Sequence, residues 1–194
     1  MRKVGLLAPA GTMESLHAAV QCGCDAVYLG GTMFGARAYA GNSDDAQMKE
    51  AIRYAHIHGV RVYVTMNTLL DETEIDAAFD YARFLYEHDV DALIIQDLGL
   101  AERVHTQLPD LELHASTQMH IHNRMGIETA RRLGMKRVVL PRESTIEEIR
   151  AAADLAMDPA VFVHGALCLS YSGSCLVDAA LLGRAGSGGN CARR

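Results

Sequence analysis

Three cysteines near the end of the chain are the residues best suited to chemistry. Cys168, Cys175 and Cys191 follow the spacing C-x₆-C-x₁₅-C in a stretch rich in Gly and Ser. Thiolates are soft ligands that bind iron–sulfur clusters or Zn²⁺. Three thiolates leave one position of a four-ligand site open, so a fourth ligand would have to come from elsewhere. The spacing alone is equally compatible with three loop cysteines that bind no metal.

Histidines offer two alternative chemistries. His164 precedes Cys168 by four residues, and an imidazole can activate a cysteine nucleophile. Catalytic partners are usually distant in sequence, however, and the chain contains neither G-x-S-x-G nor H-E-x-x-H. His120 and His122 would share one face of an extended segment as metal ligands, or lie in a solvated loop.

Seven short apolar runs alternate with amphipathic stretches of helical periodicity. The runs are Val4–Ala8, Ala26–Leu29, Arg61–Met66, Ala92–Ile95, Leu111–Ala115, Arg137–Leu140 and Ala160–Val163. Continuous apolar runs are typical of strands buried on both faces of a parallel sheet. Helices are expected over 12–21, 44–58, 73–88, 98–108, 123–133 and 145–156. Ser144 and Glu147 predict a capping box, and Gly59 and Gly134 stand where helices should end.

The alternation predicts an α/β fold, an incomplete (β/α)₈ barrel of parallel strands with about seven units present. The alternative is an open doubly wound sheet, but no G-x-G-x-x-G follows the first strand. We expect residues 1–166 to form the barrel region and residues 167–194 a Cys-containing loop. This loop would lead into a missing C-terminal part of a longer protein. Exposed sheet edges could favour a homodimer.

Composition narrows the class of protein. Eighteen Lys and Arg against 24 Asp and Glu give a net charge of -6, which disfavours a free-standing nucleic-acid binder. No apolar run approaches the roughly 20 residues of a membrane-spanning helix. Five cysteines exclude a fully disulfide-paired monomer, and we expect a cytoplasmic protein.

Polar residues concentrate where the predicted strands end, which is where barrel enzymes build their active sites. His114, for example, is expected at the end of the fifth strand. The candidate catalytic residues are Arg37, Asn67, Gln118, Arg142 and His164. Either arginine could bind a carboxylate through two hydrogen bonds. Each candidate could equally be a plain loop or cap residue.

Six blocks together resemble the peptidase U32 family, the so-called collagenase-like proteases. They are Leu7–Gly11, Asp25–Gly31, Phe34–Asn42, His114–Gln118, Val138–Glu143 and the segment Cys168–Cys175. The resemblance covers essentially the whole chain and corresponds to the N-terminal barrel region of the family.

The resemblance carries functional expectations. The family is named for proteolysis, but its better-understood members resemble iron–sulfur enzymes of oxygen-independent hydroxylation, acting on tRNA wobble uridine, rRNA or the ubiquinone ring. It implies a 4Fe–4S cluster whose first three ligands correspond to Cys168, Cys175 and Cys191, and prephenate as a small-molecule hydroxyl donor. We therefore expect an RNA hydroxylase. The alternatives are a peptidase and a non-catalytic barrel that binds a ligand or partner.

Overall fold

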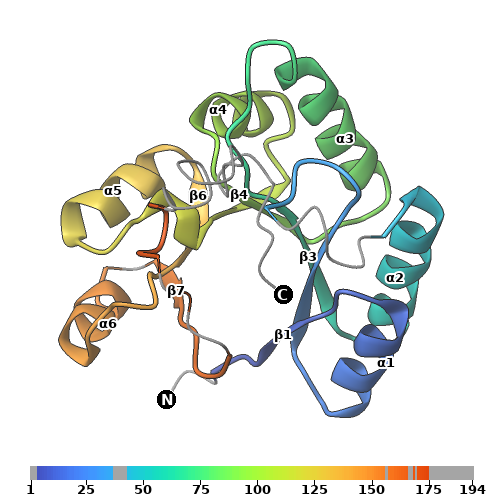
Figure 1. The fold of residues 1–194 in the computed structure, drawn as a ribbon, viewed down its shortest axis with the longest axis horizontal. Coiled ribbons are helices and arrows are strands. Elements are labelled where there is room, and N and C mark those ends of the chain that lie inside the picture. The colour runs from blue at the N-terminus through green and yellow to red at the C-terminus, as the bar shows by residue number, and fades with distance from the viewer. Residues whose placement is uncertain (1–3, 37–42, 156, 166–167, 169, 175–194) are drawn as a thin grey trace.

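Seven parallel strands form one curled sheet with helices on its outer side (Figure 1). The computed structural model describes residues 4–36, 43–155, 157–165, 168 and 170–174. The strands are β1 (Leu7–Pro9), β2 (Ala26–Gly30), β3 (Arg61–Met66), β4 (Ala92–Ile95), β5 (Glu112–Ala115), β6 (Met135–Val139) and β7 (Asp158–Ala160). Each strand pairs in parallel with the next along the chain.

Helices connect successive strands. They are α1 (Met13–Gln21), α2 (Asp45–Ile57), α3 (Ile75–Glu87), α4 (Leu98–Gln107), α5 (Arg124–Arg132) and α6 (Ile146–Ala153), and a 3₁₀ turn, η1 (Thr117–Met119), follows β5. Polar side chains cap most helix starts by accepting otherwise unpaired backbone N–H groups. Asp97 accepts from the Leu100 N–H at 2.9 Å, and Asn123 accepts from the Gly126 N–H at 2.9 Å.

The predicted barrel architecture is confirmed. The strand order follows the sequence without reversal, whereas a doubly wound sheet reverses direction at its switch point. In the described residues, the sheet extends from β1 to β7 as an incomplete barrel. No helix in this part of the chain is long and apolar enough to cross a membrane.

Several predicted boundaries are wrong. The first strand begins at Leu7 rather than Val4, and the last is Asp158–Ala160 rather than Ala160–Val163. The exposed run of Val161 to Val163 lies beyond the last pairing with β6. Apolar character alone therefore misplaced this strand, because its register is set by backbone pairing and by an ion pair between Arg137 and Asp158.

The predicted capping box is displaced by one residue. Thr145 and Glu148 form it, with the Thr145 hydroxyl 3.2 Å from the Glu148 backbone nitrogen. Ser144 instead belongs to the preceding turn, where its backbone N–H donates to the Pro141 carbonyl. Gly59 and Gly134 end helices as predicted, with φ angles of 70° and 80° that favour glycine.

The main hydrophobic core lies between the helices and the outer face of the sheet. Every residue of β4 is buried, as expected for a strand covered on both faces. A smaller apolar cluster of Ala26, Tyr63, Ala92 and Ile94 lies on the opposite, lumenal face of the sheet. The helices therefore fix the positions of the strands, and the strand ends hold the loops of the candidate site.

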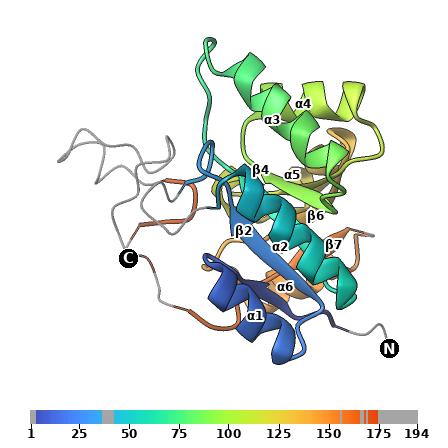
Figure 2. The same cartoon turned by 90° about the vertical axis from the view of Figure 1, so that its right-hand side faces the viewer.

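Figure 2 shows the barrel from the side. The described part of the Cys-bearing segment, coloured orange-red, lies on the side to which the carboxyl ends of the strands point. We call this end of the barrel the mouth, and residues 168–174 the Cys segment. The described part of the Cys segment thus lies at the mouth, the end of the barrel where the sequence analysis expects the active site.

Candidate functional site at the barrel mouth

The Cys segment is held on the loops that follow β5 and β6. The Arg142 guanidinium donates to the Ser170 carbonyl at 3.3 Å, and the Glu143 carboxylate accepts from the Ser172 N–H at 3.1 Å. The His120 ring donates through Nδ1 to the Ser172 carbonyl. Three side chains from two loops thus fix the backbone of the segment that carries Cys168.

Gly173 allows the Cys segment to approach the barrel closely. Its φ angle is 79°, a conformation that other residues rarely adopt. A Cβ atom at this position would lie 2.6 Å from the carbonyl oxygen of Gln118, a backbone atom that cannot rotate away. Both the conformation and the space at this position therefore require glycine.

Glu143 is suited to its role as an acceptor. Burial opposes ionisation of its carboxyl group, but hydrogen bonds from its own backbone and from Ser172 outweigh this effect. The pKa of Glu143 is consequently lower than its ordinary value. The carboxylate is charged at neutral pH and strengthens its hydrogen bond to the Cys segment.

A layer of amide and hydroxyl groups lies across the mouth, one position beyond the last rungs of three neighbouring strands. Asn67 accepts from the Ala36 N–H at 3.1 Å and donates to the Ser116 hydroxyl at 3.5 Å. Gln96 donates to the Gln118 carbonyl at 3.4 Å, whereas its buried Oε1 accepts no hydrogen bond from the described residues. The layer therefore offers a fixed acceptor to a hydrogen-bond donor.

The structure brings several predicted site residues together. Asn67 and Arg142 reach the mouth by side-chain contacts, and Gln118 reaches it through its backbone. His164 is exposed, and within the described residues it forms no hydrogen bond with the Cys168 thiol. The predicted residues Arg37, Cys175 and Cys191 lie outside the described residues.

His114 does not lie in the mouth as predicted. It is a residue within β5, and its fully buried side chain occupies the barrel lumen. Nε2 lies 2.8 Å from the Glu112 carboxylate, and the ring meets the Tyr63 ring edge-on at 4.6 Å between centroids. The period of two along a strand places residues 112, 114 and 116 on one face, and only the last of these reaches the mouth.

A polar cluster links the strands across the lumen. The Arg137 guanidinium pairs with the Asp158 carboxylate and donates to the Tyr63 hydroxyl at 3.1 Å. These contacts join β3, β6 and β7. Neither Arg137 nor Tyr63 is exposed. The cluster therefore lies inside the barrel, where it holds the three strands together.

Burial dominates the electrostatics of this cluster. It lowers the pKa of His114 below its ordinary value, with a further contribution from the positive charge of Arg137, against an opposing effect of Glu112. The hydrogen bond from His114 in turn lowers the pKa of Glu112. At neutral pH the pair therefore consists of a neutral imidazole and a carboxylate.

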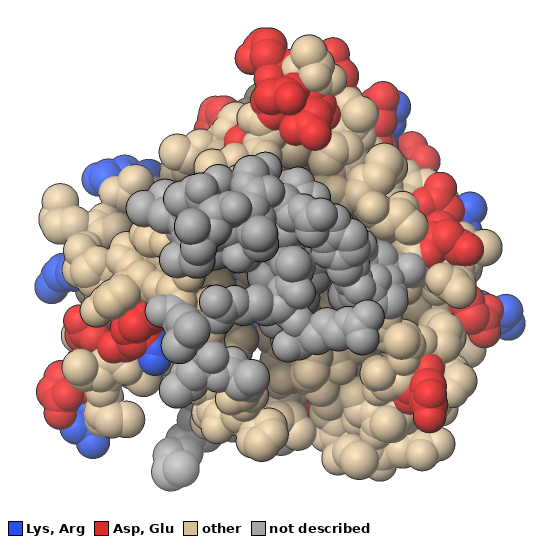
Figure 3. Space-filling view, viewed as in Figure 1, with Lys and Arg blue, Asp and Glu red and all other residues tan. Residues whose placement is uncertain are grey.

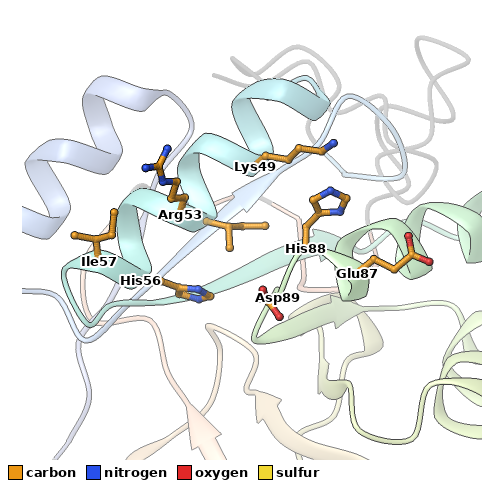
Figure 4. A pocket seen from close by; sticks show the side chains of 8 residues that line it. Lys49, Arg53, His56, Ile57, Glu87, His88 and Asp89 are labelled. Carbon is orange, nitrogen blue, oxygen red and sulfur yellow. The ribbon is translucent and has the colours of Figure 1, made fainter.

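A cavity of about 380 Å³ lies away from the mouth, between the ends of α2 and α3 (Figure 4). Lys49, Arg53 and His56 line it on one side, and His88 and Asp89 on the other. These helix ends precede strands β3 and β4 and lie at the opposite end of the barrel. Because its charges are mixed and it is remote from the Cys segment, we do not place the candidate site there.

Cys168 has the properties of an available ligand. It is partly exposed and forms no disulfide with another described cysteine. Within the described residues, no three His, Cys, Asp or Glu side chains form a metal site, so His120 and His122 lack a third such partner. Cysteine thiolates are suitable ligands for iron. The geometry of the site that the three cysteines would form depends on Cys175 and Cys191, which lie outside the described residues.

The fold and site define a class, a TIM-type β/α barrel with a cysteine-bearing segment fixed across the carboxyl ends of its strands. The family model of peptidase family U32 matches residues 11–194. The chain belongs to this family, as the resemblance in the sequence indicated.

Two curated relatives are similar over almost the whole chain. The 23S rRNA 5-hydroxycytidine C2501 synthase of Escherichia coli (strain K12) is 39% identical over 194 residues, covering 98% of this chain and 29% of the relative. The tRNA hydroxylation protein P1 of Bacillus subtilis (strain 168) is 34% identical over 193 residues, covering 98% and 45%. The chain thus spans less than half the length of either relative.

A solved structure supports the fold. The U32 peptidase Mk0906 superposes with a TM-score of 0.68 at 16% identity, covering 83% of this chain and 70% of that chain. At this level of identity the similarity concerns the fold alone.

Sequence reasoning did not single out Ser172, Gly173 and His120 as the residues that hold the Cys segment. The only signal for the first two was the density of Gly and Ser around the cysteines. His120 was considered only as a metal ligand or a solvated residue. Its hydrogen bond to a residue 52 positions away depends on tertiary packing that no local pattern encodes.

Proposed function

We propose that the protein containing this chain is an iron–sulfur-dependent, oxygen-independent RNA hydroxylase. The observation that carries the proposal is the fixed position of the Cys segment across the barrel mouth, where barrel enzymes carry out their chemistry. Family membership and the similarity to rRNA and tRNA hydroxylation proteins support RNA as the substrate class.

Cys168, Cys175 and Cys191 would hold a 4Fe–4S cluster, with a fourth ligand from outside this chain. The cluster supplies redox chemistry that no protein side chain provides. The residues of the chain supply position: Arg142, Glu143 and His120 hold the backbone around Cys168, and the amide layer of Asn67 and Gln96 faces the mouth. Fixed hydrogen-bonding groups orient a substrate at little cost in reorganisation.

A small carboxylate such as prephenate is the proposed hydroxyl donor. Arg142 directs its guanidinium toward the mouth, where one nitrogen already donates to Ser170. The remaining N–H groups of Arg142, or alternatively those of Arg37, would bind a carboxylate. Replacing each arginine by lysine should weaken donor binding, and unchanged affinity in both variants would contradict the assignment. We further propose a cytoplasmic protein and, from the edges of the sheet, a homodimer.

The peptidase alternative has less support in the structure. A thiol nucleophile needs an adjacent base, and the described residues give the Cys168 thiol no hydrogen bond to His164. Within the described residues, His164 forms no hydrogen bond with a carboxylate that could orient it, and the Glu143 carboxylate accepts from Ser172 instead.

The experiment compares Cys168→Ser with Cys22→Ser in the full-length protein. Cys22 is an exposed free cysteine at the C-cap of α1 and serves as the matched control. After anaerobic purification, iron and labile sulfide should be lost in the first variant and retained in the second. Mass spectrometry of RNA from a strain lacking the gene should show a missing hydroxylated pyrimidine, which Cys22→Ser restores and Cys168→Ser does not. A wild-type protein without iron and sulfide would overturn the proposal.

A further inference from the structure

Three rings lie in a row at the rim of the mouth. The Tyr171 and His120 ring centroids are 6.2 Å apart, and the His120 and His122 centroids are 5.0 Å apart, both in edge-to-face orientation. Tyr171 is 65% exposed, and His122 is also exposed. The row therefore presents aromatic surface to solvent immediately beside the candidate site.

The central ring of this row is rigidly held. His120 has a φ angle of 54°, which is uncommon for a residue with a Cβ atom. Its backbone N–H donates to the Thr117 carbonyl at 3.1 Å, and its ring donates to the Ser172 carbonyl. Strained backbone held by its surroundings occurs preferentially at functional sites. A fixed ring loses little conformational freedom when a ligand stacks on it.

Positive charge lies along the helix that follows the ring row. Helix α5 begins at the mouth, directly after His122 and its cap, and its last turn, toward the opposite end of the barrel, carries Arg131 and Arg132. The one carboxylate of this helix, Glu128, already pairs with Arg124 at 2.9 Å. Within the described residues, neither Arg131 nor Arg132 forms an ion pair with a carboxylate.

The charge of α5 differs from that of the chain as a whole. Figure 3 shows blue side chains at the left edge, where α5 lies, and red side chains gathered over α3 and the loop before it, while both colours also occur at the right edge. The chain as a whole carries a net charge of -6. A basic helix in an acidic protein is complementary to a polyanion, and it is not explained by general solubility.

We propose that Tyr171, His120 and His122 form a base-stacking platform for single-stranded RNA, whose phosphates pass over α5. This inference rests on the proposed function and names the form of RNA and the residues that bind it. Proteins bind single strands by combining exposed aromatic rings, on which every base can stack, with a basic surface that the phosphate backbone follows. A duplex keeps its bases stacked on one another and offers none to the rings.

The test measures RNA binding by the full chain without cluster or donor. The probe is a fluorescein-labelled twelve-nucleotide oligouridine, free or in duplex with oligoadenosine, followed by fluorescence anisotropy. The single strand should bind more tightly than the duplex. Tyr171→Ala should weaken single-strand binding roughly tenfold, because it removes one stacked base, whereas Tyr171→Phe should retain it. The matched control is Tyr86→Ala, which removes an exposed tyrosine of α3.

The electrostatic part has a separate readout. Replacing Arg131 and Arg132 by alanine should lower the slope of log affinity against log salt by about 1.4, since each phosphate contact to a single strand contributes about 0.7. The matched control replaces Arg53 and Arg83, which are exposed on α2 and α3. It should leave the slope unchanged.

Three results would each overturn the platform: no binding of oligouridine by the wild-type chain, equal binding of the duplex, or wild-type affinity in Tyr171→Ala. If Tyr171→Ala alters the circular dichroism spectrum, His122→Ala replaces it, and its unchanged affinity is then decisive against the proposal. A changed sedimentation coefficient with unchanged RNA affinity would assign the rings to contact between copies of the chain. Because binding needs no iron, failure of the hydroxylase proposal would leave this result standing, and the reverse also holds.

Discussion

The His120 ring and the Ser172 carbonyl, 52 residues apart in sequence, are joined by a hydrogen bond at the barrel mouth. Ser172 lies four residues after Cys168, so this bond ties the cysteine-bearing backbone to the loop after β5. Arg142 and Glu143 add ties to the loop after β6. The position of the Cys168 thiol therefore depends on the folded barrel and not on its own segment alone.

Gly173→Ala should release the Cys segment. The new Cβ atom would meet the Gln118 carbonyl at 2.6 Å and would also force alanine into a φ angle of 79°. Gly23→Ala is the matched control, because Gly23 has a φ angle of 82° but no atom within 4 Å of the added Cβ. Both variants share the conformational cost of about 1 kcal/mol, and only Gly173→Ala has the backbone clash.

The measurement is the rate of iodoacetamide labelling at Cys168, read by peptide mass spectrometry. Labelling of Cys168 should accelerate in Gly173→Ala and remain at the wild-type rate in Gly23→Ala. Equal rates in the two variants would show that the clash does not hold the segment in place.

The elements could be predicted from the sequence, whereas the contacts between them could not. The buried run Ala92–Ile95 and the helix ends at Gly59 and Gly134 carry local signals, and the structure confirms them. The strand at Asp158–Ala160 was misplaced because it is short, contains a charged residue and depends on an ion pair with β6. The local pattern of apolar residues carries no information about an ion pair with another strand.

In the candidate site, too, the positions of residues after strands could be predicted, whereas the contacts between loops could not. Asn67, Gln118 and Arg142 were predicted because residues after strand ends meet at one end of a barrel. His114 was expected at the end of the fifth strand, and it lies one residue before that end, but its side chain is buried in the lumen and does not reach the mouth. The support of the Cys segment by His120 and Gly173 depends on packing between loops, which residue type does not reveal.

His114 should make the protein less stable in mild acid. Its folded-state pKa lies below the ordinary value of 6.5, so the unfolded chain binds a proton first as the pH falls below 6.5. Stability is therefore full above that pH and is lost as the pH decreases toward the folded-state pKa. Glu112, whose pKa is also lowered, extends the loss below its ordinary value of 4.5.

Urea denaturation between pH 7.5 and 5 tests this expectation. His114→Gln retains a donor for Glu112 but does not titrate, so its urea midpoint should change less over this range. His17→Gln, at an exposed position on α1, should keep the wild-type slope. A parallel decline in all three proteins would exclude His114 as the source.

Asp158→Ala should lower the free energy of unfolding, because it removes the partner of Arg137 in the lumen. Arg137 is only 13% exposed in its side chain, and removing its carboxylate partner leaves a charge that water reaches poorly. We expect a loss of about 3 kcal/mol in the free energy of unfolding, against about 1 kcal/mol for Tyr63→Phe, which removes one hydrogen bond. A cycle with Arg137→Met measures the coupling, and costs that add independently would contradict a shared cluster.

Gln96→Met should separate stability from activity. Within the part of the chain that the structure describes, the wild-type side chain buries Oε1 without a hydrogen-bond partner and donates to the Gln118 carbonyl at 3.4 Å. An apolar side chain of similar length removes both the unpaired acceptor and the long hydrogen bond, two effects that oppose each other. The melting temperature should therefore change by only a few degrees.

If the acceptor serves the substrate, RNA hydroxylation by the full-length protein should decrease at least tenfold, as expected where a site retains a locally unfavourable group for function. Full activity in this variant would assign Gln96 to the barrel structure alone.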